Sequence, residues 1–238
     1  MTTAIDGQTF KLVHDDDGGQ HIHDKTFTNC VFDNCTFAIP RDLHSRSTAS
    51  HLKFIDCVAA SSSVGPGLID EVIIDGLEVR PILLLWSPFL RHVTLRGRIG
   101  PLNINSIPTF VNLTAALTAS FAEARAAHYQ TVDWALDIRE GRFEGFSLSG
   151  VPASLVRRDP VTQVVVTRMK ASSDGWKTVV PSWNSHWASV IDSFLNDKYL
   201  ADDAELILVA YWDASKKRFQ RVVDGLRNLQ DIGVAELD

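Results

Sequence analysis

Large and small apolar residues near the start of the chain recur at an unusual interval. In residues 25–37 (KTFTNCVFDNCTF), phenylalanine, cysteine and asparagine each reappear five positions later. A β-strand alternates with a period of two and an α-helix with 3.6, so an interval of five fits neither. The pattern indicates a chain that turns a corner after each short extended segment and points one small and one large residue inward.

A similar inward pair is found further along the chain. It occupies Cys35–Phe37, Cys57–Ala59, Leu77–Val79 and Val93–Leu95, at intervals of 22, 20 and 16 residues. Units that recur after about 20 residues predict coils that stack on one another and share one core. The cysteines in such positions act as small apolar members of an inward ladder.

The repeat over residues 25–37 resembles the pentapeptide-repeat family, whose members are right-handed quadrilateral β-helices with a small residue two places before an inward Leu or Phe. The resemblance fades through about residue 104, because the later coils lose the five-residue register. The family often has Asp or Asn before the central large residue, where this chain has Val31 and Thr36. The resemblance implies a mainly β fold, with a right-handed β-solenoid over residues 1–150.

Helical spacing interrupts and then follows this pattern. Leu113, Leu117 and Phe121 lie among alanines and predict a helix over about residues 112–128, inserted in the solenoid or capping it. From residue 151 onward, a strand at 163–168, a helix around 183–194, a strand at 205–211 and a final helix ending before Gly233 follow in turn. This order predicts a small α/β unit over residues 151–238, either a separate domain or a cap on the solenoid.

An acidic turn near the N-terminus is the best candidate for a metal site. Residues 8–14 alternate like a strand and run into Asp15–Gly19, which predicts a hairpin. His14, His21 and His23 would then be candidate ligands for a zinc-like ion. Turns select Asp and Gly without any metal, so we favour a solvated hairpin tip and predict no metal or cofactor.

Composition narrows the range of partners. The chain has 238 residues and a formal net charge of −6, which argues against nucleic acid, because phosphate binding needs clustered Lys and Arg. Met1–Gly7 has no basic region followed by an apolar one, and no apolar run is long enough to span a membrane. With only three cysteines, we expect reduced thiols and a cytoplasmic protein of bacterial type.

No common catalytic motif is present, so no catalytic residue is predicted. The chain lacks the glycine-rich phosphate loops, the G-x-S-x-G nucleophile elbow and the H-E-x-x-H zinc motif. Stacked coils that present side chains rigidly suit a binding protein instead.

Aromatic and basic residues of the C-terminal half are the candidate partner-binding residues. They are Trp183, Trp187, Arg157, Arg158, Lys216, Lys217 and Arg218. Exposed tryptophans form binding hot spots, but a helical stripe of them more often faces a core. Charges on the outer face of a helix are usually only solvated.

The leading hypothesis is a non-enzymatic protein–protein interaction module, of the inhibitor or immunity type that occludes a partner, with its oligomeric state left open. One alternative is a β-helix enzyme acting on a carbohydrate or related polymer, since such enzymes gather charged groups on one outer face. Its charged residues would be Asp70, Glu71, Asp75, Glu78, Arg80, Arg91, Arg96 and Arg98. The resemblance implies a second alternative, an acidic DNA mimic acting on a topoisomerase, although a net charge of −6 is modest for that role.

Overall fold

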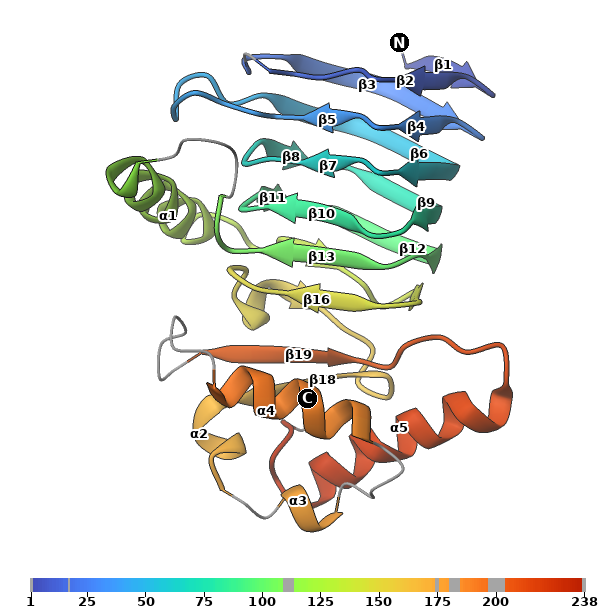
Figure 1. Ribbon diagram of the computed structural model, residues 1–238, viewed down its shortest axis with the longest axis vertical. Helices are drawn as coiled ribbons and strands as arrows, with labels where there is room; N and C mark the ends of the chain where they lie inside the picture. The colour runs from blue at the N-terminus through green and yellow to red at the C-terminus, as the bar shows by residue number, and fades with distance from the viewer. Residues whose placement is uncertain are drawn as a thin grey trace. The chain divides into compact units, whose positions relative to one another are not determined.

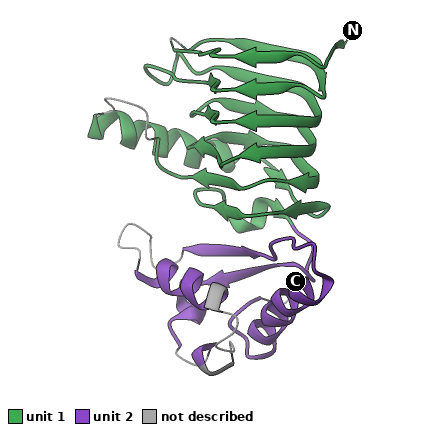
Figure 2. Ribbon diagram, turned by 45° about the vertical axis from the view of Figure 1, so that its right-hand side comes forward, with its two compact units in different colours: residues 1–157 green, residues 158–238 purple. Residues whose placement is uncertain are grey.

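The structure is a computed structural model that describes residues 2–16, 18–108, 114–173, 176–179, 185–196 and 204–236. The chain divides into two compact units, Met1–Arg157 and Arg158–Asp238 (Figure 2).

The first unit is mainly β and is built from short strands stacked in parallel (Figure 1). The larger sheet has the neighbour order β1 (Thr3–Asp6), β3 (His21–Thr28), β6 (Thr48–Ala60), β9 (Ile73–Arg80), β12 (Val93–Ile99), β14 (Leu136–Asp137) and β17 (Val156–Arg157). Beside this path lie β2 (Thr9–Lys11), β4 (Val31–Asp33), β8 (Leu68–Asp70), β11 (Phe89–Arg91) and β15 (Gly141–Phe143). The second sheet has the order β16 (Phe146–Leu148), β13 (Leu102–Asn105), β10 (Leu83–Trp86), β7 (Ser63–Val64) and β5 (Thr36–Phe37). Long parallel sheets of this kind are compatible with a β-solenoid.

The register between strands reproduces the repeat that the sequence predicts. Thr3 in β1 pairs with Lys25 in β3, and Lys25 pairs with Leu52 in β6. The next residue of β6, Lys53, pairs with Ile73 in β9. Most partners therefore lie about one coil of 20 residues apart, and the 27-residue step between Lys25 and Leu52 accommodates the loop of residues 38–47.

Left-handed backbone angles mark the corners of the coils. They fall at five-residue intervals, at Asp24, Asn29 and Asn34, at His51, Asp56 and Ser61, and at Ser87, His92 and Gly97. The expectation that later coils lose the five-residue register is therefore wrong for the backbone. Their corners carry His, Ser, Asp and Glu in place of Asn. The five-residue spacing of the corners is therefore present in the backbone but is not visible in the sequence.

Aromatic rings and thiols line the interior of the first coils, around a cavity of about 740 Å³. Phe27 stacks on Phe54 with ring centroids 5.0 Å apart, and Phe10 stacks on Phe32 at 5.1 Å. The Cys57 thiol lies 3.5 Å from the carbonyl oxygen of Phe27 in the preceding coil and donates to it. The cysteines are free thiols that act as small inward residues, as the ladder pattern indicates.

The predicted N-terminal hairpin is wrong. β2 pairs with β4 in parallel, so the chain after Lys11 continues around a coil and does not fold back on itself. Asp15 is buried, and its carboxylate accepts hydrogen bonds from the Ala38 amide and the Ser47 hydroxyl. Asp15 therefore stabilises the loop between Ala38 and Ser47 in the next coil. Turn propensity alone does not predict this role.

One helix is inserted between β13 and β14. It is α1 (Ala115–Tyr129), close to the expected 112–128, and the Thr114 side chain caps it by accepting a hydrogen bond from the Leu117 amide at 3.2 Å. The insertion lengthens the step between paired strands, because Val93 pairs with Leu136. A short 3₁₀ helix at Ala153–Leu155 precedes β17.

Within its described residues, the second unit has two antiparallel strands and four helices. The strands are β18 (Gln163–Thr167) and β19 (Glu205–Val209), and the helices are α2 (Arg168–Ala171), α3 (Trp176–Val179), α4 (Ser185–Asn196) and α5 (Lys216–Asp231). The strand–helix–strand–helix order matches the pattern in the sequence. Gly233, at φ 74°, follows α5 in the left-handed conformation that ends a helix.

Candidate functional site

One corner of the first unit carries titratable side chains in three successive coils. His51, Glu71 and His92 all have left-handed φ angles, of 52°, 51° and 54°. They lie above one another because their neighbours Ser50, Asp70 and Arg91 pair across β6, β8 and β11. We call His51, Glu71 and His92 the corner column.

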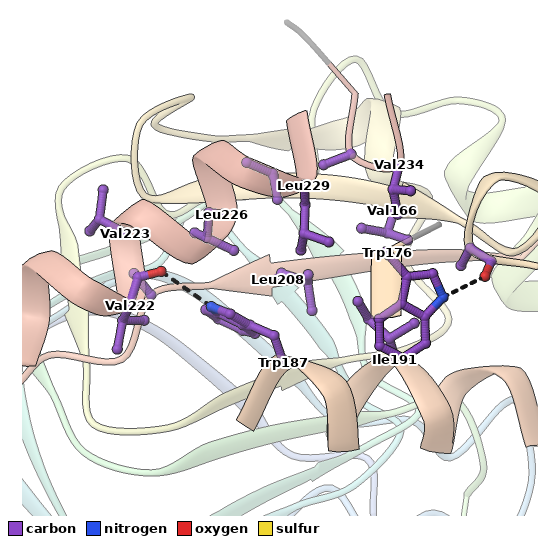
Figure 3. Close-up of a cluster of buried hydrophobic side chains, with 14 residues drawn as sticks. Val166, Trp176, Trp187, Ile191, Leu208, Val222, Val223, Leu226, Leu229 and Val234 are labelled. Carbon is purple, nitrogen blue, oxygen red and sulfur yellow. Dashed lines mark hydrogen bonds between the residues drawn. The ribbon is translucent and has the colours of Figure 1, made fainter. Parts of the chain in front are cut away.

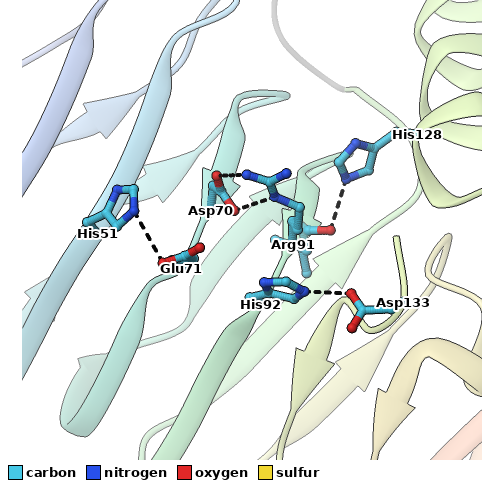
Figure 4. Close-up of polar contacts among 8 residues, drawn as sticks. His51, Asp70, Glu71, Arg91, His92, His128 and Asp133 are labelled. Carbon is cyan, nitrogen blue, oxygen red and sulfur yellow. Dashed lines mark hydrogen bonds and ion pairs between the residues drawn. The ribbon is translucent and has the colours of Figure 1, made fainter. Parts of the chain in front are cut away.

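The members of the corner column interact with each other and with a nearby carboxylate (Figure 4). His51 Nε2 lies 3.2 Å from Glu71 Oε2, and His92 Nε2 lies 2.6 Å from Asp133 Oδ1. His51 and Glu71 are about half exposed, and His92 is 29% exposed. The column is therefore reachable from solvent, while each of its imidazoles lies against a carboxylate.

A charged pair lies immediately behind the column. Asp70 is only 8% exposed, and both of its carboxylate oxygens accept hydrogen bonds from the guanidinium of Arg91. These hydrogen bonds hold the pKa of Asp70 below its usual value, although burial acts in the opposite direction. The same contact raises the pKa of Arg91. Asp70 is thus a carboxylate fixed in its charged form beside the column.

Aromatic contacts fix the orientation of His92. Its ring stacks on Trp134 with centroids 4.6 Å apart, and the guanidinium of Arg157 lies 4.2 Å from the centroid of the same indole. A ring that is both stacked and hydrogen-bonded loses little further freedom when it binds a ligand.

The arrangement offers ligand chemistry more readily than bond-breaking chemistry. Donor atoms of Asp70, Glu71 and His92 all lie within 4.8 Å of one another, a spacing from which a cation could be held. Among the described residues, this is the one group of three or more His, Cys, Asp and Glu donors that is so close.

Other charged residues of the coils are neutralised by ion pairs, either within one strand or with a neighbouring coil. These pairs are Arg96 with Asp75 at 2.8 Å, Arg98 with Glu144 at 2.6 Å and Arg80 with Glu78 at 2.5 Å. Most of the charges expected for an enzymatic face are therefore distributed as ion pairs over the outer surface.

The Asp70–Arg91 pair predicts a pH-dependent stability. Asp70→Asn should lower the free energy of unfolding by about 1 kcal/mol at neutral pH, a modest value because Arg91 is half exposed to solvent. The folded pKa of Asp70 is depressed, so its contribution is complete above the unfolded pKa of about 3.9 and is lost as pH falls through the folded value. Urea unfolding of both proteins at pH 7 and pH 3 checks this, and a gap that does not narrow at pH 3 would contradict it. Glu78→Gln, in the exposed pair with Arg80, is the matched control and should change stability little at either pH.

The structure separates the residues proposed for partner binding. Trp187 is 1% exposed, and its Nε1 donates to the Val222 carbonyl in the core of the second unit (Figure 3). Trp183 lies outside the described residues. Arg157 covers Trp134, and Arg158 is partly buried. Lys216, Lys217 and Arg218 are exposed in the first turn of α5, where Arg218 contacts Asp213 at 3.0 Å.

The three candidate metal-binding histidines do not converge on one point. His14 Nδ1 contacts the Thr36 hydroxyl at 2.8 Å beside the second sheet. His21 and His23 lie in β3 of the larger sheet, and His23 contacts Asp24 at 3.0 Å. The hairpin that would have joined them is replaced by a coil.

Glu71 is among the charged residues that the sequence singles out, but His51 and His92 were missed because they are isolated in the sequence. His51, Glu71 and His92 are 20 and 21 residues apart, which is the coil interval itself. Aligning the sequence coil by coil would have placed all three in one column.

Comparison with known proteins provides little guidance. No protein-family model and no curated protein matches the chain. Among solved structures there is a faint likeness to QnrB1, a plasmid-mediated fluoroquinolone resistance protein, with 11% identity over 84% of this chain and 100% of that chain. The TM-score is 0.16, too low to support an argument about fold or function. Among the described residues, no helix has the length and apolar character needed to cross a membrane.

Proposed function

We propose that the protein is a protein–protein interaction module in which α1 is the principal contact surface. The observation that carries the proposal is an exposed alanine stripe along one side of this helix. Ala115, Ala119, Ala122 and Ala126 are spaced along one side of the helix, and all four are exposed. An outer helical face is usually charged, so a stripe of small apolar residues in solvent is typical of a surface that a partner covers.

The side of α1 next to the alanine stripe is anchored to the coils. Phe121 is fully buried, and the Tyr129 hydroxyl donates to the Pro88 carbonyl at 3.2 Å. Arg125 donates to the Ser87 hydroxyl and to the Ser106 carbonyl, and His128 Nε2 donates to the Leu90 carbonyl at 2.9 Å. A helix held this firmly loses little conformational entropy on binding, and its small side chains allow a partner backbone to approach closely.

We also propose a specific type of fold and a specific kind of interaction module. Left-handed corners at five-residue steps and parallel strands offset by about 20 residues support a right-handed β-solenoid of the pentapeptide-repeat kind. On such a scaffold we propose an inhibitor or immunity-like role in which α1 occludes a site on the partner. The exposed basic turn Lys216–Arg218 is a second proposed contact, suited to an acidic partner.

The ion pairs favour this role over the two alternatives. A DNA mimic needs a continuous row of unneutralised carboxylates, whereas Asp70, Asp75 and Glu144 each lie against an arginine. The same pairing disfavours a polymer-cleaving enzyme, because it engages the carboxylates that would serve as acid and base.

A matched pair of double variants tests the alanine stripe. Ala119→Glu with Ala126→Glu places charge on the stripe, while Ala116→Glu with Ala127→Glu places the same charge on exposed positions roughly 100° around the helix. Tagged native protein should capture one stoichiometric partner from native lysate. The stripe variant should retain at least about tenfold less of it, since buried unpaired charge costs several kcal/mol, and the control variant should retain it.

Circular dichroism should show equal helix content in both double variants. Equal retention of the partner by both variants, or capture of no stoichiometric partner by the native protein, would contradict the assignment of α1.

A further inference from the structure

We propose that the corner column binds one divalent transition-metal ion of the zinc class. Glu71 and His92 would be the central ligands, with Asp70 and His51 as further ligands beside Glu71 (Figure 4). The proposal rests on the contacts of these side chains and is independent of the role proposed for α1.

The donor atoms are close enough to converge after small rotations. Those of Asp70, Glu71 and His92 lie within 4.8 Å of one another, and His51 Nε2 is 3.2 Å from Glu71. Ligands bound tetrahedrally at about 2.1 Å lie roughly 3.4 Å apart. Glu71 and His51 are half exposed and free of packing on one side, so they can close the remaining gap.

The charges around the corner column favour a cation. Asp70, Glu71 and Asp133 contribute three negative charges, against the positive charges of Arg91 and of Arg157, which lies over the Trp134 indole that stacks on His92. Without the histidines, the formal charge is −1. Arg91, whose side chain is half exposed, donates to both oxygens of the nearly buried Asp70, and each carboxylate oxygen retains a lone pair beyond the one that accepts its hydrogen bond.

His92 has the supporting contacts of a metal-binding imidazole. Its Nε2 lies 2.6 Å from Asp133, so with the proton on Nε2 the other ring nitrogen, Nδ1, carries the lone pair needed for a metal. A carboxylate behind the histidine fixes the tautomer and increases its basicity. The stack on Trp134 holds the plane of the ring.

The mixture of donors selects the class of ion. Two imidazoles with carboxylates suit Zn²⁺, Co²⁺ or Ni²⁺, whereas Mg²⁺ and Ca²⁺ require a set made of oxygens. The three buried or half-buried cysteines lie on the interior side of the coils, where their thiols donate to backbone carbonyls. A cobalt complex at the corner column should therefore lack thiolate charge-transfer absorption.

The variants must respect the left-handed backbone of the corner. Asparagine tolerates this conformation, and the chain itself uses it at the corner residues Asn29 and Asn34. His92→Asn and Glu71→Asn therefore remove ligands without straining the fold. His23→Asn is the matched control, because His23 is an exposed histidine beside a carboxylate in the same sheet.

The experiment is zinc titration of the full-length, tag-free, chelator-stripped protein by calorimetry, followed by Co²⁺ absorption spectroscopy. We expect one equivalent of Zn²⁺ per chain, at least about tenfold weaker binding for His92→Asn and Glu71→Asn, and a change within twofold for His23→Asn. Asp133→Asn should weaken binding about tenfold while leaving the stoichiometry at one.

Thermal unfolding without metal should give similar midpoints for all variants, which separates loss of a ligand from loss of the fold. No binding, binding of several equivalents, or undiminished affinity in the double variant His92→Asn with Glu71→Asn would overturn the proposal. Competition by millimolar Mg²⁺ would overturn the assignment to the zinc class.

Discussion

Trp187→Ala is expected to unfold most of the second unit. The indole is 1% exposed and packs in the cluster that contains Ile191, Leu208 and Val222 (Figure 3). Truncating a fully buried aromatic residue costs about 3–5 kcal/mol, because apolar contacts are lost and a cavity remains. That approaches the total stability of a small domain. Hydrogen exchange followed by mass spectrometry should show lost protection in β18, β19 and α5.

Trp187→Phe is the matched control for this prediction. It keeps most of the apolar volume and removes only the hydrogen bond from Nε1 to the Val222 carbonyl, so it should cost about 1–2 kcal/mol and leave the second unit folded. If Trp187→Ala kept full protection in β18, β19 and α5, the indole could not be a core residue. Trp187 would then again be a candidate partner-binding residue.

The second unit was predictable because its elements follow ordinary periods. Val222, Val223, Leu226 and Leu229 recur at helical spacing, and α5 buries all four. The continuous apolar run around Leu208 likewise becomes a buried strand. The same pattern explains why Trp187 faces inward, since a helical stripe of large apolar residues is how a small unit builds its core.

The first unit was predictable only where corner and interior residues repeat together. Asn29 and Asn34 tolerate left-handed angles and precede inward cysteines, so the five-residue step is visible there. At Ser61, Ser87 and His92 the backbone makes the same turn with residues that carry no clear signal. Local propensity also misassigned Asp15, because its partners Ala38 and Ser47 come from the next coil.

The candidate site was hidden for a related reason. Its side chains come from separate coils and meet only because the strands stack in parallel register. Glu71 and His92 occupy left-handed corners, a conformation that costs most residues about 1–2 kcal/mol. Such residues are retained where the surrounding structure or a function requires them, and this argument becomes available only once the backbone angles are known.

Phe27→Ala is expected to destabilise the first unit by about 3–5 kcal/mol. Phe27 is 6% exposed, stacks on Phe54 and makes edge contacts with Phe10 and Phe32 at centroid distances of 5.9 Å and 5.6 Å. Its loss opens a cavity between stacked coils, and each coil is stabilised mainly by its neighbours. The free energy of unfolding, measured in urea by far-ultraviolet circular dichroism, should fall by that amount.

Phe10→Ala tests whether position in the stack governs this cost. Phe10 contacts two aromatic rings, those of Phe27 and Phe32, but belongs to the first coil and is partly exposed, so its loss should cost about half as much. Equal losses for the two variants would mean that the aromatic residues act as one cluster and that stability does not depend on the order of the coils.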